Sequence, residues 1–189
     1  MEDIFKELNG CIKKLEKAIE EAGLFAHTET NILERKLKDW EKNGIRSKLT
    51  GLIVAPEDVD FRINQFGHEH DGKYYFTYNE AIGLEKHLPD GWRLPTRSEW
   101  VLLCEEFGND EDGELSADRL VEKLNLKVNG YCSDDMCYGK GSYGRYWSKS
   151  IGYATYGYNL YFNTFGNVSP QDYSNKRYGF SVRLVKKVE

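Results

Sequence analysis

The sequence has no long apolar run, no excess of positive charge and no need for disulfide cross-links. No apolar stretch approaches the roughly 20 residues that cross a bilayer, and the first residues lack the basic, apolar and small-residue order of a signal peptide. A net charge of −5 argues against nucleic-acid binding by phosphate neutralisation. A length of 189 residues is enough to bury a core without disulfides. We therefore expect a folded protein without membrane insertion, located in the cytoplasm or in a virion, whose partners are proteins or neutral ligands.

Patterns that carry catalysis are also missing. The four histidines fall in predicted helices and in an acidic loop, without a nucleophile motif nearby, and no glycine-rich phosphate loop precedes a helix. His68 and His70, next to Glu69 and Asp71, invite a metal interpretation, but a metal site needs three or four convergent ligands. We interpret this stretch as a solvated hairpin loop. The sequence thus predicts no catalytic residue, no metal site and no cofactor.

What the sequence does have is a second half rich in tyrosine. Residues 55–125 carry 17 acidic and 7 basic side chains, whereas residues 129–180 carry 3 acidic and 5 basic ones. Ten of the 13 tyrosines lie between Tyr131 and Tyr178, among many Asn, Ser and Gly residues. Binding loops use this mixture, because tyrosine gives a large contact area at low entropic cost and the polar residues adapt their hydrogen bonds. The alternative is a β-rich half with aromatic pairs across its strands.

The N-terminal segment predicts helices. Apolar residues recur at steps of four and three through residues 2–22, which indicates a helix with an apolar seam. Such a seam either joins copies of the chain into a homo-oligomer through residues 2–22 or packs on its own domain. Gly23 ends this helix, and a second one runs to Gly44, so the two form a hairpin. We predict a helical segment over 1–48 and a separate domain over 49–189.

From residue 49 onward the pattern is that of short strands and capped helices. Strands are predicted at 52–54 and 74–76, joined by the polar loop that contains His68 and His70. The sequences Thr77-x-x-Glu80 and Thr96-x-x-Glu99 are capping boxes, in which both side chains satisfy backbone donors, so a helix begins at each. A shorter helix follows Ser116.

The last sixty residues predict strands separated by polar loops. The strand at 158–163 has Leu160 and Phe162 on one face and polar residues on the other. Further strands are predicted at 146–148 and 178–185, and loops at 151–157 and 166–176. The chain is therefore expected to be α+β.

Four motifs occur in a specific order within residues 49–189: Asp90-Gly-Trp-Arg-Leu-Pro-Thr-Arg-Ser-Glu-Trp100, Gly141-Ser-Tyr-Gly-Arg-Tyr-Trp-Ser148, Leu160-Tyr-Phe162 and Gly179-Phe-Ser-Val-Arg-Leu-Val185. In this order they resemble the bacterial C-type-lectin-fold group, which includes FISUMP-type domains, formylglycine-generating enzymes and variable proteins diversified by retroelements. The resemblance implies a C-type lectin fold that follows the N-terminal helical segment.

The motif residues themselves suit a structural role. Trp92 and Trp147 are large enough to anchor a core, and Thr96 caps a helix. Arg93 and Arg183 are expected to form ion pairs at the edge of the core. We therefore expect these residues to hold the fold rather than to contact a ligand.

Resemblance to the diversified proteins implies a ligand- or receptor-binding protein, phage- or prophage-encoded, whose C-terminal segment is rewritten at adenines of its own coding sequence. Residues 151–178 contain 6 Tyr, 4 Asn, 2 Ser and 1 Asp, as expected from Asn and Tyr codons altered in this way. The implied binding surface is formed by residues 151–157, 159–163 and 167–178. Its candidate ligand contacts are Tyr153, Tyr156, Tyr158, Asn159, Tyr161, Asn163, Asn167, Asp172, Tyr173, Ser174, Asn175 and Tyr178.

Two other functions stay open. FISUMP-type domains have the same polar loops without a retroelement, which makes an undiversified adhesin or a carbohydrate- or protein-binding module the main alternative. A formylglycine-generating-type oxidase would need paired thiols for copper(I), and the only close pair is Cys132 and Cys137. We interpret these two as a small disulfide or as free thiols. The prediction is a non-enzymatic protein that binds a protein or glycan ligand.

Overall fold

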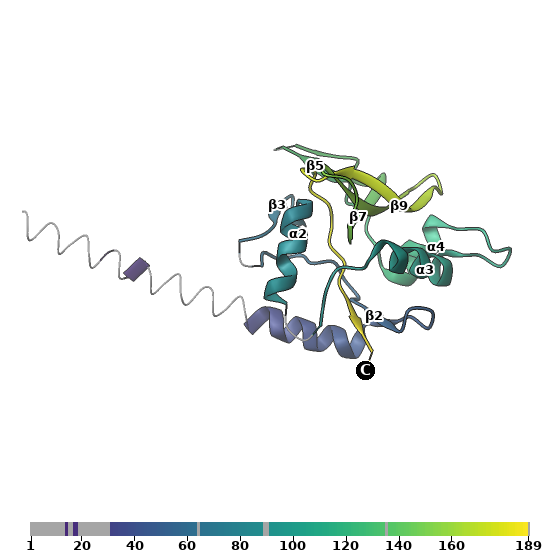
Figure 1. Cartoon of the computed structure of the whole chain (residues 1–189), viewed down its shortest axis with the longest axis horizontal. Helices are drawn as coiled ribbons and strands as arrows, with labels where there is room; N and C mark the ends of the chain where they lie inside the picture. The colour runs from purple at the N-terminus through teal and green to yellow at the C-terminus, as the bar shows by residue number, and fades with distance from the viewer. Residues whose placement is uncertain are drawn as a thin grey trace, which may run out of the picture. The chain divides into compact units, whose positions relative to one another are not determined.

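A computed structural model of the chain describes residues 14, 17–18, 31–63, 65–88, 91–134 and 136–188 (Figure 1). The chain divides into two compact units, Met1–Lys38 and Asp39–Glu189. In the first unit residues 14, 17–18 and 31–38 are helical. The rest of the predicted seam, the turn at Gly23 and the oligomer through residues 2–22 lie outside the described residues.

The second unit begins before the predicted boundary at residue 49. Helical structure continues through residue 43, and strand β1 (Ile45–Arg46) already belongs to this unit. Trp40 explains the difference, because its buried indole packs edge-on against Trp92 at a ring-centroid distance of 6.0 Å. Its Nε1 donates a hydrogen bond of 3.0 Å to Glu57 Oε1.

One antiparallel sheet joins the two ends of this unit. Strand β2 (Leu52–Val54) lies between β1 and β10 (Val185–Lys187), with Val54 opposite Ile45 on one side and Val185 on the other. All three residues of β2 are buried, which confirms the predicted strand at 52–54.

The predicted pairing of this strand with a strand at 74–76 was wrong. Residues 73–75 form β4 (Lys73–Tyr75), which pairs with β3 (His68–His70) in a separate hairpin. The predicted loop around His68 and His70 is therefore mostly strand. Asp71 and Gly72, with φ of 51° and 70°, make the two-residue turn for which Asp-Gly is favoured.

The three helices predicted after residue 49 are confirmed, together with their caps. Helix α2 (Tyr78–Leu84) continues into the 3-10 turn η1 (Glu85–His87), and α3 (Arg97–Gly108) and α4 (Ala117–Leu124) follow. Both capping boxes are formed, at Thr77 and at Thr96. Arg93 donates hydrogen bonds of 2.8 and 2.6 Å to Glu99, as its predicted ion pair requires. Burial opposes the charge of Glu99, but the bonds from Arg93 and Thr96 outweigh it and lower the pKa of Glu99.

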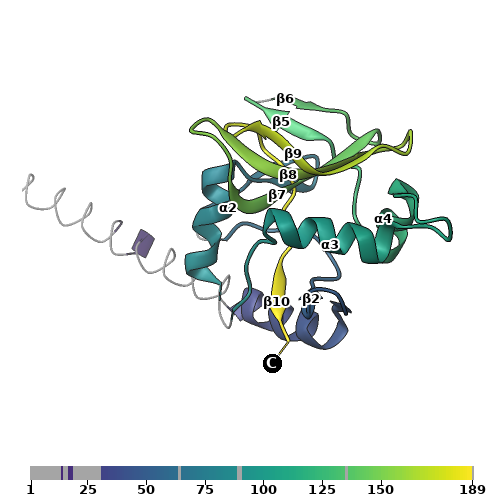
Figure 2. The same ribbon diagram turned by 45° about the vertical axis from the view of Figure 1, so that its right-hand side comes forward.

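The central sheet consists of β7 (Tyr143–Ile151), β8 (Tyr156–Asn163) and β9 (Val168–Asn175), with β8 in the middle. Helices α3 and α4 lie beneath it, and the hairpin of β5 (Tyr131–Ser133) and β6 (Met136–Tyr138) lies above it (Figure 2). Tyr146, Leu160 and Phe162 point toward the helices and join one buried core with Trp100 and Leu103. The predicted strands at 146–148 and 158–163 are confirmed, whereas the predicted loop at 166–176 is mostly strand β9.

The last segment is more deeply buried than a surface strand. Phe180, Val182 and Leu184 are buried together with their neighbours in residues 179–185, but only Val185 begins a strand, so the prediction of one strand over 178–185 was wrong. The segment forms backbone hydrogen bonds to the chain on both of its sides. On one side, Phe180 and Phe76 exchange bonds of 3.0 and 2.9 Å. Phe180 stacks on Trp147 at 4.1 Å, which confirms Trp147 as a core anchor.

The described residues therefore form an α+β domain. No helix among them is both long enough and apolar enough to cross a membrane.

Candidate functional site

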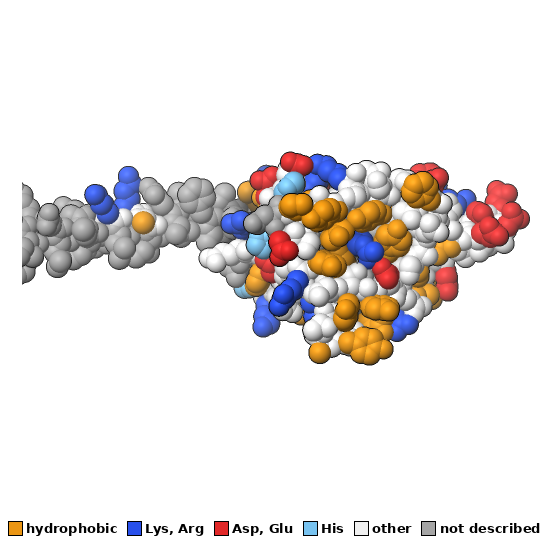
Figure 3. Space-filling view, turned by 90° about the horizontal axis from the view of Figure 1, so that it is seen from above, with side chains coloured by type: hydrophobic (Ala, Val, Ile, Leu, Met, Phe, Trp, Pro, Cys, Tyr) orange, Lys and Arg blue, Asp and Glu red, His pale blue; other side chains and the backbone are white. Residues whose placement is uncertain are grey.

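Exposed apolar side chains concentrate on the part of the domain formed by β5 to β9. Of the eleven exposed large apolar residues among those described, seven lie between residues 136 and 173. They are Met136, Tyr138, Ile151, Tyr153, Tyr156, Phe165 and Tyr173. Seen from above, hydrophobic side chains gather around a basic and an acidic group on this face (Figure 3). A folded domain that places so much aromatic surface on one side has a candidate binding face there.

Tyrosines surround Arg145 on the side of the central sheet away from α3. Arg145 on β7 pairs with Tyr161 on β8, and its guanidinium lies 4.5 Å from the centre of the Tyr161 ring. Tyr131 stacks against Tyr143 on β7 at 6.2 Å and against Tyr138 on β6 at 5.4 Å. The ring centroids of Tyr178 and Tyr131 lie 5.1 Å apart. We call this group the tyrosine face: Tyr131, Tyr138, Tyr143, Arg145, Tyr161 and Tyr178.

A polar network beneath the tyrosine face fixes Arg145. Its Nη1 donates hydrogen bonds to Asp172 Oδ2 at 2.7 Å, Ser174 Oγ at 2.9 Å and Asn159 Oδ1 at 3.1 Å. No described residue accepts a hydrogen bond from its Nε or Nη2. Because one nitrogen makes all these bonds, the guanidinium is held in place while its other donors stay available.

This network corrects two of the predicted ligand contacts. Asn159 is fully buried and Ser174 is 8% exposed, so their predicted exposure was wrong. The physical reason is that β9 is a strand and not a loop. Its pairing places Asp172 opposite Asn159, and Asn159 Nδ2 donates a hydrogen bond of 3.2 Å to Ser174 Oγ.

Burial changes the acidity of one tyrosine in this face. The pKa of Tyr143 is raised, first by burial and then by the neighbouring Tyr131 hydroxyl, although the positive charge of Arg145 opposes the shift. Tyr143 therefore keeps its proton near neutral pH and presents a neutral hydroxyl.

A second group of tyrosines consists of Tyr153 in the turn between β7 and β8, Tyr156 at the start of β8 and Tyr173 on β9. Tyr153 is 71% exposed, Tyr173 is 57% exposed and Tyr156 is 39% exposed, as predicted for ligand contacts. The rings of Tyr156 and Tyr173 meet edge to face at 5.9 Å. We call these three residues the turn tyrosines. The contact between the Tyr156 and Tyr173 rings reduces the side-chain freedom that these two residues would lose on binding.

The other predicted contacts are partly used by the fold itself. Asn163 Oδ1 accepts hydrogen bonds of 3.0 and 3.1 Å from the backbone of Phe165 and Asn167, and Asn175 Oδ1 accepts one of 3.0 Å from that of Arg177. Tyr158 is half-buried, and the guanidinium of Arg97 lies 4.5 Å from its ring centre. Asn167 is exposed at the turn between β8 and β9.

Cys132 and Cys137 form a disulfide across the β5–β6 hairpin, where they pair directly. Of the two interpretations drawn from their spacing, the structure has the disulfide. Cys104 is a buried free thiol on α3, and burial raises its pKa to about 12. No group of three or more His, Cys, Asp or Glu side chains suited to a metal ion occurs among the described residues.

Several residues of the candidate face were not predicted from the sequence. The predicted surface began at residue 151, which excluded Tyr131, Tyr138, Tyr143 and Arg145, and it left out the turn that contains Phe165. The concentration of tyrosine from Tyr131 onward was the available signal. Arg145 carried no signal, because its role depends on β9 supplying Asp172 from 27 residues away.

Comparisons with family models, with curated proteins and with solved structures give no match for this chain. Its function is therefore argued from its own residues.

Proposed function

We propose that this chain is a non-enzymatic binding protein with a C-type lectin fold, which presents the tyrosine face and the turn tyrosines to a protein or glycan ligand. The observation that carries the proposal is the gathering of exposed aromatic side chains over β5 to β9. The enzymatic alternative has less support, because Cys132 and Cys137 are joined to each other.

The motif residues support the fold assignment. Trp92 and Trp147 are buried, Thr96 caps α3 and Arg183 is enclosed in the core, which is the structural role that we expect from the chemistry of these motif residues. The two ends of the domain meet in one sheet through β2 and β10, and the candidate surface lies on a different sheet. A rigid frame and a separate display surface suit a binding protein.

The mechanism of binding rests on pre-organised contacts. The rings of the turn tyrosines supply contact area, and we expect affinity to concentrate in a few of them. Arg145, held by Asp172, offers its free Nε and Nη2 donors to carbonyl, hydroxyl or carboxylate groups of the ligand. Weak single sites would gain from avidity where residues 2–22 join copies of the chain.

Retroelement diversification is the version of this function that we favour, in a phage- or prophage-encoded protein of the virion or the cytoplasm. It makes a distinct prediction about which positions vary. Adenine-specific differences between gene copies should fall at Tyr153, Tyr156 and Tyr173, which are exposed, and should spare Asn159 and Ser174, which hold Arg145. Sequencing the DNA around the gene for a reverse transcriptase and a template repeat tests this. Their absence would favour the undiversified adhesin.

Binding itself is tested by removing the turn tyrosines. The full-length variant Tyr153→Ala/Tyr156→Ala/Tyr173→Ala and the unaltered chain are applied to a glycan array and to whole bacterial cells. Because the three rings are exposed, the free energy of unfolding should stay within about 1 kcal/mol while binding is lost. The matched control is Leu49→Ala/Leu102→Ala, which removes exposed apolar side chains outside the region. Equal loss of binding in the control, or unchanged binding in the tyrosine variant, would overturn the proposal.

A further inference from the structure

A cavity of about 600 Å³ opens between the β3–β4 and β5–β6 hairpins, and the Cys132–Cys137 disulfide forms part of its wall. Its volume lies within the range of small-molecule sites. Among the described residues, no member of the tyrosine face or of the turn tyrosines lines this cavity. The disulfide is therefore within reach of a small molecule at a place separate from the proposed binding face.

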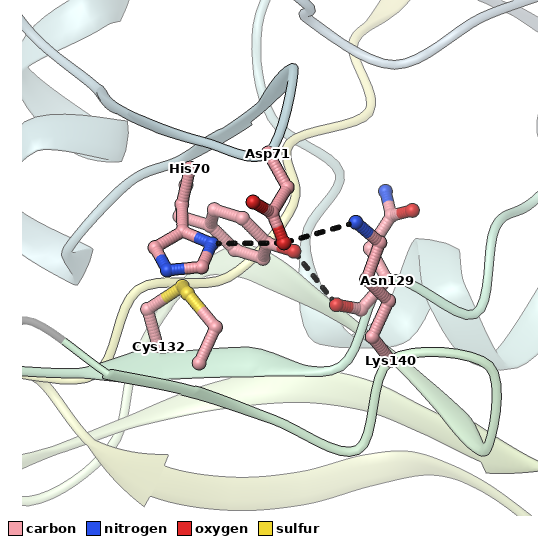
Figure 4. The surroundings of a disulfide bond; sticks show 7 residues. His70, Asp71, Asn129, Cys132 and Lys140 are labelled. Carbon is pink, nitrogen blue, oxygen red and sulfur yellow. Dashed lines mark hydrogen bonds and ion pairs between the residues drawn. A yellow bond between two sulfur atoms is a disulfide. The ribbon is translucent and has the colours of Figure 1, made fainter.

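A histidine with an oriented ring lies beside the disulfide. His70 lines the same cavity, and its Nδ1 lies 3.5 Å from Asp71 Oδ2. Lys140 Nζ holds the same carboxylate oxygen at 3.4 Å. Figure 4 shows Nδ1 of His70 turned toward Asp71, and His70 and Cys132 line the same cavity. Asp71 is close enough to Nδ1 to pair with a protonated His70 ring, and Nε2 is then the nitrogen left for proton transfer at the cavity.

Two arginines at the cavity are suited to bind a negatively charged group. Arg62 and Arg177 both line it, and no described residue accepts a hydrogen bond from either guanidinium or forms an ion pair with it. Glu69 and Asp134 also line the cavity and keep their negative charge, and each accepts a hydrogen bond within its own hairpin, of 2.8 Å from Gly72 N and of 3.5 Å from Ser133 Oγ. Guanidinium groups without a protein partner are suited to bind carboxylates through paired hydrogen bonds.

We propose that this cavity is a thiol–disulfide exchange site for a small thiol that carries carboxylate groups. Arg62 and Arg177 bind the carboxylates and direct the thiol toward the disulfide. The thiol gives its proton to His70 Nε2, and its sulfur attacks Cys137 Sγ. A mixed disulfide forms with Cys137, the Cys132–Cys137 bond breaks, and its electron pair stays on Cys132 Sγ. That thiolate then takes the proton back from the His70 imidazolium, which the Asp71 carboxylate stabilises.

The test compares two thiols acting on the oxidised full-length chain. Glutathione carries carboxylates and 2-mercaptoethanol carries none. Samples are quenched with N-ethylmaleimide, and the opening of the Cys132–Cys137 bond is followed by mass spectrometry of the peptides. The rate constant for glutathione is divided by that for 2-mercaptoethanol, and this ratio is divided by the same ratio for an oxidised peptide of residues 130–139, which has no cavity. We expect the normalised ratio to be about ten, the effect of one charge-assisted hydrogen bond.

Variants separate the two parts of the site. Arg62→Met/Arg177→Met should return the normalised ratio to about one and leave the rate with 2-mercaptoethanol unchanged. His70→Gln should slow both thiols by roughly tenfold or more, as expected for loss of an acid–base group. Arg46→Met and His87→Gln, which alter residues that do not line the cavity, are the matched controls. Circular dichroism checks that each variant is folded.

Three results would overturn the proposal. The first is a normalised ratio of one in the unaltered chain. The second is a His70→Gln variant that reacts at the original rate with both thiols. The third is a disulfide that opens only when the chain unfolds. None of these results bears on ligand binding at the tyrosine face, so the two proposals stand or fall separately.

Discussion

Arg183 offers the sharpest test of how this domain is held together. Its side chain is fully buried and donates five hydrogen bonds. Its Nε and Nη2 bond to Asp58 Oδ1 at 3.0 and 2.5 Å. The other three bonds reach the backbone carbonyls of Ala55, Leu124 and Asn125 at 2.8, 2.7 and 2.9 Å. Arg183 thus ties the end of β2, the end of α4 and the last segment together.

Replacing Arg183 with Met keeps much of the side-chain volume but removes every one of these donors. Asp58, whose side chain is 12% exposed, would keep only neutral donors, the Tyr146 hydroxyl at 2.9 Å and Asn129 Nδ2 at 3.4 Å, and no positive partner. Removing one partner of a buried ion pair costs about 3–5 kcal/mol, because the other charge stays buried without compensation. We therefore expect Arg183→Met to lower the free energy of unfolding by about 4 kcal/mol, a large part of the roughly 5–15 kcal/mol typical of a domain.

Urea denaturation followed by tryptophan fluorescence measures this loss, since Trp100 and Trp147 are buried in the same domain. The double variant Arg183→Met/Asp58→Asn removes both charges and keeps an acceptor for the Tyr146 hydroxyl. It should recover at least half of the stability that the single variant loses. A loss below about 1 kcal/mol in the single variant, or no recovery in the double variant, would refute the reasoning from an uncompensated charge.

Three further changes test single features of the fold. Burial, followed by the charge of Asp58, raises the pKa of Tyr146 in the folded state above the ordinary value of 10.0. The neutral hydroxyl therefore contributes fully to stability below pH 10.0, and this contribution should be lost as the pH rises through the folded-state pKa. Tyr146→Phe should remove this dependence in denaturation curves measured from pH 8 to pH 12. Thr96→Ala removes the cap of α3 and should cost about 1 kcal/mol in urea denaturation, whereas Thr96→Ser should cost little. Gly130 has φ of 72°, and a Cβ there would meet the carbonyl of Tyr138, so Gly130→Ala should cost more than about 2 kcal/mol and lower the melting temperature. Unchanged pH dependence, equal Thr96 variants or a stable Gly130→Ala protein would contradict the respective argument.

The prediction of the candidate site succeeded where exposure follows from a turn and failed where it depends on strand pairing. Tyr153 and Tyr156 belong to the turn between two recognisable strands, so their exposure could be expected. Asn159 and Ser174 looked equally suited to a binding loop. They are buried because β9 pairs with β8 and brings Arg145 over both of them. Polar residues on both faces of β9 leave no hydrophobic period that would reveal a strand.

The amino-acid sequence by itself determined the features that depend on residues close together in the chain. Both capping boxes join a Thr to a Glu three residues later, so the starts of α2 and α3 were readable directly. The alternation of Leu160 and Phe162 likewise identified the middle strand of the central sheet. Each of these signals acts over one turn of helix or a few residues of strand, and no other part of the chain is needed to produce it.

Only the tertiary structure decided the features that join distant residues. The pairing of β2 with β10, the burial of Arg183 against Asp58 and the position of Arg145 beside Asp172 all depend on chain segments that meet after folding. The spacing of Cys132 and Cys137 allowed either thiols or a disulfide, and the register of the hairpin brings the two sulfurs together. A side chain becomes a ligand contact or a structural support according to the neighbour that covers it, and that neighbour is chosen by the fold.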